Sequence, residues 1–193
     1  LAFTDARLLL LPVRSVTRSL MYVTSPLLIR RFERDLEAFG VEEFEVSATL
    51  TLFDDERPGG GRPSHLPDPE VLVADASLTR EPLVLEDFVY RPEEVEQAPG
   101  LSELTEGLTA FLPEHERVGR NRIPNNTVVI RDEPFMDLVQ RALPVVARNQ
   151  LTRAKTTDKY ETVEGSEESG NLWYEERLPA DTLMYSVAGT IRM

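Results

Sequence analysis

The order of predicted elements along the 193-residue chain indicates an α+β protein whose sheet carries its helices on one face. Two observations predict this class. Short apolar runs typical of strands recur along the sequence, and segments with helical periodicity interrupt them at irregular intervals. No internal repeat or heptad pattern indicates another architecture, and the length allows one domain over residues 1–193 with a substantial core.

The first third of the chain predicts a strand followed by a helix. RLLLLPV (residues 7–13) is apolar, too short for a core helix, and has a proline near its end, so we expect a buried strand. The helix that follows has clear limits, with Thr24 or Ser25 as N-cap, Pro26 in the first turn and Gly40 just past the end. Its apolar side chains form one stripe, namely Leu28, Phe32, Leu36 and Phe39.

The middle of the chain predicts further strands around a break. Apolar and polar residues alternate in FEVSATLTLF (44–53), as in a half-buried strand. Three glycines and four prolines make residues 54–70 a predicted flexible insertion loop. The segments that follow are two predicted strands, an acidic loop and a short helix: EVLVADA (70–76), PLVLEDFVY (82–90) and RPEEVEQAPGLSELTEGLTAFLPEH (91–115).

The last third predicts strands on both sides of a helix and of a polar excursion. Asp132 ends the strand NTVVIRD and is expected to cap the helix EPFMDLVQRAL, with Pro134 in its first turn. The polar stretch from about 153 to 170 is predicted to be a projecting hairpin. The remaining predicted strands are PVVARNQLT (144–152), the segment 172–178 and DTLMYSVAGTIRM (181–193).

Charge is distributed unevenly along the chain. The net charge of −13 would repel a nucleic acid at long range, but residues 1–31 and residues 141–160 are each net positive by four, whereas residues 42–116 are net −15. Phosphate contacts act at short range, because cellular salt screens charges over roughly 8 Å. A local basic face that binds nucleic acid is therefore compatible with the composition, and ordinary solvated arginines are the alternative.

Several function classes lack their usual signals. The chain has no cysteine, and its longest apolar run, LLLLPV, is too short to cross a bilayer and lacks the flanks of a signal peptide, so we expect a cytoplasmic protein that does not bind membranes. His65 and His115 show no metal-ligand spacing, and no P-loop, nucleophile elbow, zinc helix or Rossmann motif is present. Paired carboxylates such as Glu86 and Asp87 are expected to be solvated, capping or ion-paired.

The stretch NLWYEERLPADTL (171–183) is the main candidate for chemistry. Trp173 and Tyr174 could stack a base, while Glu175 and Arg177 could hold a phosphate or a metal-bound water. On a strand, Trp173 and Glu175 would share one face. The competing interpretation is structural, and for Trp173 we expect packing in the core.

Three stretches resemble one family: FTDARLLLLPVRSVTRSLMYVTSPLLIRRFERDL, VVIRDEPF and LWYEERLPADTLMYS. They are similar to the backbone subunit of the Cmr complex, the type III-B CRISPR effector, which belongs to the RAMP superfamily of RNA-binding proteins. The resemblance implies a ferredoxin-like, RRM-related RAMP fold with insertions and a projecting thumb hairpin. It also implies a helical stack of copies on the guide region of CRISPR RNA (crRNA), assembled with other Cmr subunits in antiviral defence.

The same resemblance implies an activity. Family members are metal-dependent endoribonucleases that cut complementary target RNA at regular intervals, so the expected cofactor is a divalent metal, Mg²⁺, whose ligands here are unknown. The family's catalytic aspartate would lie upstream of residue 1, and Asp5 is not its counterpart. We therefore expect the domain to lack its N-terminal segment and this fragment to be inactive alone.

The site residues implied by the resemblance lie around the thumb. Glu175 matches a glutamate implicated in cutting, and Arg177 stands where the family often has a tyrosine. The residues expected to contact the RNA backbone are Arg148, Asn149, Arg153, Lys155, Lys159 and Arg177. Two alternatives stay open: a non-catalytic crRNA-binding scaffold, and an acidic module that binds a protein partner.

Overall fold

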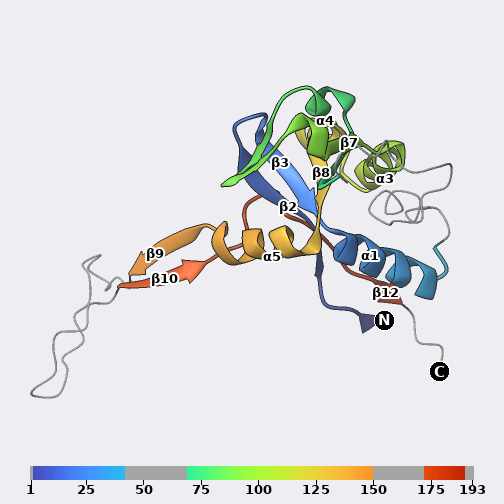
Figure 1. Cartoon of the computed structure of the whole chain (residues 1–193). Helices are drawn as coiled ribbons and strands as arrows, with labels where there is room; N and C mark the ends of the chain where they lie inside the picture. Colours follow the sequence, from blue (N-terminus) through green and yellow to red (C-terminus); the bar gives the residue numbers. More distant parts are fainter. Residues whose placement is uncertain (1, 42–68, 150–171, 190–193) are drawn as a thin grey trace, which may run out of the picture. The chain divides into compact units, whose positions relative to one another are not determined.

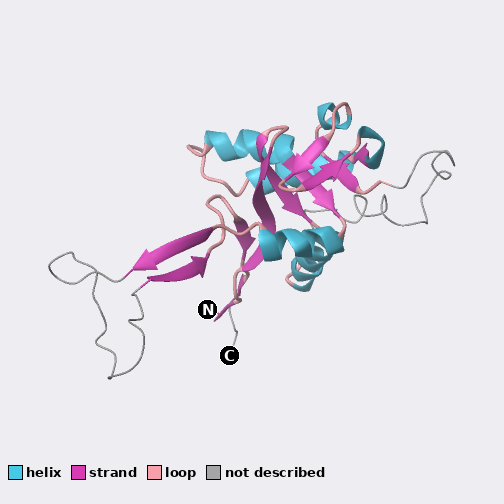
Figure 2. Cartoon of the chain, turned by 60° about the vertical axis from the view of Figure 1, so that its left-hand side comes forward, coloured by secondary structure: helices cyan, strands magenta, loops and turns pink. Residues whose placement is uncertain are grey.

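The computed structural model describes residues 2–41, 69–149 and 172–189, and the chain divides into two compact units. The sheet unit comprises Leu1–Ala142 and Ala180–Met193, and the hairpin unit comprises Leu143–Pro179. Figure 1 colours the elements of both units along the sequence, and Figure 2 distinguishes helices from strands. The predicted strand 44–53 and nearly all of the predicted loop 54–70 lie outside the described residues.

The sheet unit contains a six-stranded mixed sheet. Its strands in spatial order are β11 (Leu183–Tyr185), β2 (Arg7–Ser15), β3 (Ser19–Thr24), β8 (Thr127–Ile130), β4 (Val71–Val73) and β7 (Val95–Gln97). The β3–β8 and β4–β7 pairs are parallel, and the other pairs are antiparallel. A separate short pair joins β1 (Ala2–Phe3) to β12 (Ala188–Gly189). The mixed sheet with its helices confirms the α+β class.

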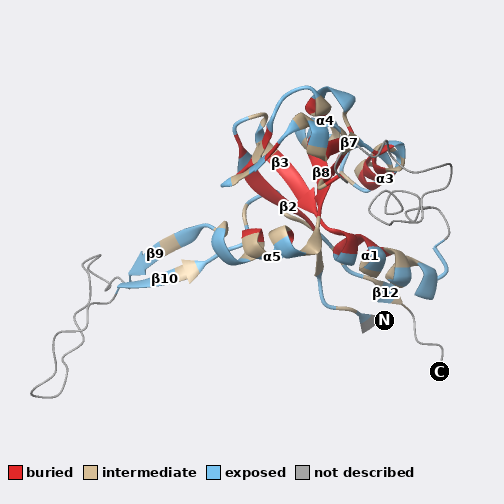
Figure 3. Cartoon of the chain, viewed as in Figure 1, coloured by how far each residue is buried: buried red, intermediate tan, exposed pale blue. Residues whose placement is uncertain are grey.

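Within the described ranges, four helices accompany the sheet: α1 (Pro26–Ala38), α3 (Pro99–Thr109), α4 (Arg117–Asn126) and α5 (Asp132–Arg141). Apolar side chains of α1, α3 and α4 share one core with the strands, including Leu10, Tyr22, Ile29, Leu72, Leu101, Ile123 and Val129. The alternate strand residues Met21, Val23, Val71, Val73, Val128 and Ile130 are also buried, so both faces of the sheet are covered (Figure 3).

The start of α1 is capped differently from the prediction. Ser25 occupies the N-cap position, but its hydroxyl makes no capping hydrogen bond. The Leu27 N–H instead donates to Asp132 Oδ1 at 2.9 Å. Asp132 was predicted to cap α5, yet it is the first residue of α5 and caps α1. The prediction was wrong because a sequence pattern does not show that the parallel neighbours β3 and β8 lead into helices that start at the same edge. Gly40 follows the helix end with φ +68°, as predicted.

Other predicted elements also need correction. PLVLEDFVY is a hairpin of β5 (Leu83–Leu85) and β6 (Phe88–Tyr90), because Glu86 adopts φ +50° and turns the chain. Glu86 forms an ion pair with Arg14 at 2.9 Å, which confirms the ion-pair interpretation of that acid. The predicted last strand is split into β11 and β12, and β3, β7 and α4 were not predicted. Two 3₁₀ turns, η1 (Ala76–Thr79) and η2 (Pro92–Glu94), complete the sheet unit.

Asp35 joins three elements of the sheet unit. Its carboxylate Oδ2 pairs with the Arg7 guanidinium of β2 and accepts a hydrogen bond from the Tyr185 hydroxyl of β11 at 2.7 Å. Burial alone would raise the pKa of Asp35, but the hydrogen bonds from Tyr185 and Arg7 and the Arg7 charge outweigh it, so the pKa lies below its ordinary value. The Tyr185 ring also meets Phe32 edge to face, with centroids 4.9 Å apart.

The helices in the described ranges include none that is long and apolar enough to cross a membrane.

Leu72→Ala should unfold the sheet unit at markedly lower denaturant. Leu72 is 0% exposed in the core, and deleting its isobutyl group should lower the free energy of unfolding by about 3 kcal/mol. Leu27→Ala is the matched control, because Leu27 is 57% exposed and its loss should cost less than about 1 kcal/mol. Urea titration measures both, and equal losses would contradict the assigned core.

Asp35→Asn should lower stability at neutral pH by about 1–2 kcal/mol, because it removes a charged hydrogen-bond partner. The pKa of Asp35 is lowered in the folded state, so the unfolded chain binds more protons in acid. This stabilisation should be complete above about pH 5, start to decline near the ordinary value of about 3.9, and be lost as the pH falls through the lowered pKa of the folded protein. The difference in unfolding free energy between the two proteins should therefore shrink from pH 7 to pH 3, and a constant difference would disprove the assignment.

Candidate nucleic-acid interface

The hairpin unit is built on two antiparallel strands, β9 (Val145–Asn149) and β10 (Leu172–Glu176), drawn in orange and red in Figure 1. Both strands were predicted, since β-branched and aromatic residues favour an extended backbone. The register places Arg148 opposite Trp173 and Val146 opposite Glu175. Alternation along the strands therefore brings Arg148, Trp173 and Glu175 to one face.

On this face, Glu175 is the centre of a hydrogen-bonded group. Its Oε1 accepts from Trp173 Nε1 at 2.9 Å, and its Oε2 accepts from Arg148 Nε at 3.2 Å and from Arg177 Nη2 at 3.1 Å. We call these four residues the Glu175 cluster. Three donors thus hold one carboxylate, and both of its oxygens are engaged.

The Glu175 cluster is open to solvent. The side chains of Arg148, Glu175 and Arg177 are 43%, 40% and 43% exposed. Ion pairs this exposed contribute no more than about 1 kcal/mol each, so the cluster orients its members more than it stabilises the hairpin. Two guanidinium groups against one carboxylate leave a net positive face, and each guanidinium has further N–H donors to offer a phosphate.

Trp173 does not pack in a core, contrary to expectation. It is 43% exposed, and Tyr174 on the opposite face is 68% exposed. In the described part of the hairpin unit there is no helix or second sheet to cover either face. The apolar residues of LWYEE suggested burial, but a two-stranded ribbon has no interior.

Of the remaining predicted RNA-binding residues, only Asn149 is described, and it does not join the cluster. Asn149 lies at the end of β9 opposite Leu172, on the other face from Arg148. Arg153, Lys155 and Lys159 lie outside the described residues. The residues that the structure does bring together are Arg148, Glu175 and Arg177, with Trp173 as a fourth member.

A metal site is not formed by the described residues, which contain no group of three or more histidine, aspartate or glutamate side chains placed to hold an ion. His115 is exposed between α3 and α4, as its isolated position in the sequence suggested, and His65 is not described. The donor set present therefore does not fit the expected Mg²⁺.

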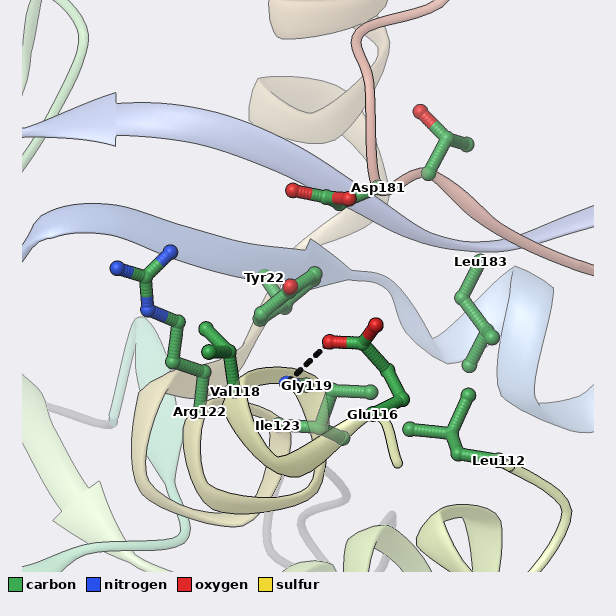
Figure 4. A pocket seen from close by; sticks show the side chains of 10 residues that line it. Tyr22, Leu112, Glu116, Val118, Gly119, Arg122, Ile123, Asp181 and Leu183 are labelled. Carbon is green, nitrogen blue, oxygen red and sulfur yellow. Dashed lines mark hydrogen bonds between the residues drawn. The ribbon is translucent and has the colours of Figure 1, made fainter. Parts of the chain in front are cut away.

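The sheet unit also has a cavity of about 170 Å³ that sequence reasoning missed (Figure 4). Tyr22, Arg122 and Asp181 line it together with apolar side chains of α4 and β11. Burial raises the pKa of the Tyr22 hydroxyl, and Asp181, which has φ +65°, adds to the effect. Two larger cavities lie in the same unit, one of about 300 Å³ beside Arg14 and Asp137 and one of about 350 Å³ beside Phe32 and Tyr185. The Glu175 cluster is the better candidate site because it groups two arginines and a half-exposed tryptophan on one open face. No sequence pattern indicated these cavities.

No family model matches the sequence. A curated relative, the CRISPR system Cmr endoribonuclease Cmr4 of Pyrococcus furiosus, is 33% identical over 183 residues, which are 95% of this chain and 52% of the relative. The crystal structure of oligomeric Cmr4 from Pyrococcus furiosus superposes with a TM-score of 0.60 at 26% identity, over 96% of this chain and 55% of the other.

A second solved structure supports the fold alone. A chain of the Type III-B Cmr-beta complex, determined by cryo-EM bound to cognate target RNA, matches with a TM-score of 0.57 at 20% identity, over 96% of this chain and 55% of that one. The chain therefore spans about half the length of the relatives it matches. These matches confirm the resemblance of the three motifs: the chain is similar to Cmr4 over almost its whole length.

Proposed function

We propose that the chain is part of a backbone subunit of a type III-B CRISPR effector, which binds the guide region of crRNA and takes part in cutting complementary target RNA. The observation that carries the proposal is the 33% identity, over 95% of the chain, to a protein named as a Cmr endoribonuclease. The oligomeric state named for the Pyrococcus furiosus crystal structure supports copies of the chain, with other Cmr subunits, as partners. A cytoplasmic location follows as part of the same proposal.

In this proposal the sheet unit is a ferredoxin-like RAMP core and the β9–β10 hairpin is the base of the thumb. The likeness to Cmr4 structures supports the assignment, and so does the separation of residues 143–179 as a compact unit. Residues from about 153 to 170, the proposed thumb, connect the two strands. The Glu175 cluster would then lie at the base of the thumb.

Each member of the Glu175 cluster has its own role in the proposal. Arg148 and Arg177 bind phosphates of the guide or the target, and base pairing between the two RNAs reads the sequence. Glu175 is required for the cutting step because it holds both arginines. Mg²⁺ would stabilise charge that develops at the scissile phosphate, but the described residues supply no group to hold it, so the proposed metal dependence needs ligands outside them.

A non-catalytic, crRNA-binding scaffold is the second candidate. It is favoured by the engagement of both Glu175 oxygens, because a carboxylate that is held by three donors is poorly placed to accept a further proton or a metal. The two candidates share the RNA-binding face and differ only in cutting. Divalent-metal-dependent cleavage by the assembled complex distinguishes them.

Glu175→Ala should lower the rate of periodic target cleavage by about tenfold or more, because Arg148 and Arg177 lose their common partner. Glu176→Ala is the matched control, since Glu176 is exposed on the opposite face of β10 and takes no part in the hydrogen bonds of the cluster. Cleavage of labelled target RNA by the assembled complex with Mg²⁺ is the measurement. Unchanged cuts in the Glu175 variant, with assembly intact, would favour the scaffold.

Arg148→Gln should weaken RNA binding at every sequence tested. The loss of one phosphate contact should also reduce the slope of log affinity against log salt by about one. Arg141→Gln is the control, because Arg141 is an arginine of α5 that is more exposed than Arg148 (77% against 43%) and is paired with Asp137 at 3.8 Å. Binding titrations at several salt concentrations measure both slopes. Equal slopes for all three proteins would remove Arg148 from the interface.

A further inference from the structure

Trp173 is an unusual residue to leave at the surface. It is the single tryptophan of the chain, and 43% of it is exposed on a ribbon of two strands. Tryptophan is largely buried on average in folded proteins, and an exposed one often marks a binding surface. The Glu175 cluster explains how Trp173 is held there.

The indole ring is oriented by the chain itself. Its N–H donates to Glu175 Oε1 at 2.9 Å, and Arg148 and Arg177 hold the same carboxylate through Oε2. The polar edge of the ring is therefore satisfied internally. What remains available to a ligand is the flat, apolar face of the ring.

The charges around the ring select the partner. Among the described residues, Arg148 lies opposite Trp173 and Arg177 shares its carboxylate partner. Glu175 offsets only one of these two positive charges, so the face attracts an anion. A planar apolar group joined to negative charges on both sides matches this arrangement, and a nucleotide within an RNA strand is such a group. A base inside a duplex has both faces covered by its neighbours, so only an unpaired base could reach the ring.

We propose that Trp173 is a stacking platform for one unpaired nucleobase of RNA, oriented by Glu175, while Arg148 and Arg177 of the same cluster bind the adjoining phosphates. This inference rests on the proposed RNA-binding function and names a contact within it. It makes Glu175 a positioning residue that acts through Trp173 and the arginines. The reacting atoms then need not touch the carboxylate.

The positioning role predicts rescue by a conservative change. Glu175→Gln keeps an oxygen that can accept from the Trp173 indole, whereas Glu175→Ala keeps none. Gln should therefore restore most of the RNA binding and cleavage that Ala loses. If Gln were as inactive as Ala in cleavage while it restored binding, Glu175 would act directly on the reaction and the positioning role would be wrong.

Tryptophan fluorescence tests the stacking contact. The signal of Trp173 is the difference between the full-length protein in its complex and the same complex with Trp173→Phe. A short oligoadenylate should quench this difference signal, and a sugar-phosphate chain of equal length without bases should not. Trp173→Ala should weaken oligoadenylate binding by roughly fivefold or more, and Trp173→Phe should weaken it less, because phenylalanine keeps an aromatic face.

The outcomes separate the stacking contact from the proposed function when binding of labelled RNA is measured in the same samples. Stacking would be overturned if RNA bound tightly without quenching Trp173 fluorescence, or if Trp173→Ala left the RNA affinity unchanged. The RNA-binding function would stand in either case. If acrylamide fails to quench Trp173 fluorescence before RNA is added, a protein partner covers the ring, and this result also overturns the proposal. A complex that binds no RNA at all would remove both.

Discussion

The parallel pairing of β3 with β8 is the contact on which the rest of the sheet unit depends. It joins segments about a hundred residues apart through Tyr22 and Thr127, Val23 and Val128, and Thr24 and Val129, all of them buried. Both strands lead directly into helices, and parallel neighbours deliver those helices at the same edge of the sheet. Asp132 can therefore supply the hydrogen bond that the first turn of α1 lacks, while the Ser25 hydroxyl in the N-cap position makes none.

The fold could be predicted where the signals were local. Pro26 and Gly40 delimit α1 within a few residues, and the apolar run of β2 has few alternatives. The helix α4 was missed because Gly119 and Pro124 oppose helix formation and Ile123 is the one buried apolar side chain in it. Its stability comes from tertiary contacts, such as the bonds of Arg120 to the carbonyls that follow α3. No local pattern reports contacts of this kind.

In the candidate site too, contacts between residues close in sequence were predictable and contacts between distant residues were not. The spacing of Trp173 and Glu175 was enough to place them on one face of a strand. The participation of Arg148, 27 residues before Glu175, depends on the register of β9 against β10, which the sequence does not specify. The exposure of Trp173 was mispredicted for a related reason. Composition suggests how apolar a strand is, but burial depends on what lies above it.

The hairpin unit interrupts the sheet unit in sequence, and its described strands, β9 and β10, pair with each other and not with the sheet. Residues 143–179 leave after α5 and return just before β11, which closes the edge of the sheet beside β2. Both ends of this excursion are therefore anchored by a body that is complete in its strand order without it. The entropic cost of closing such a loop grows only with the logarithm of its length. Insertions, deletions and substitutions within residues 143–179 can therefore leave the strand order of the sheet unchanged. The length of the hairpin can then differ between relatives whose sheets are alike.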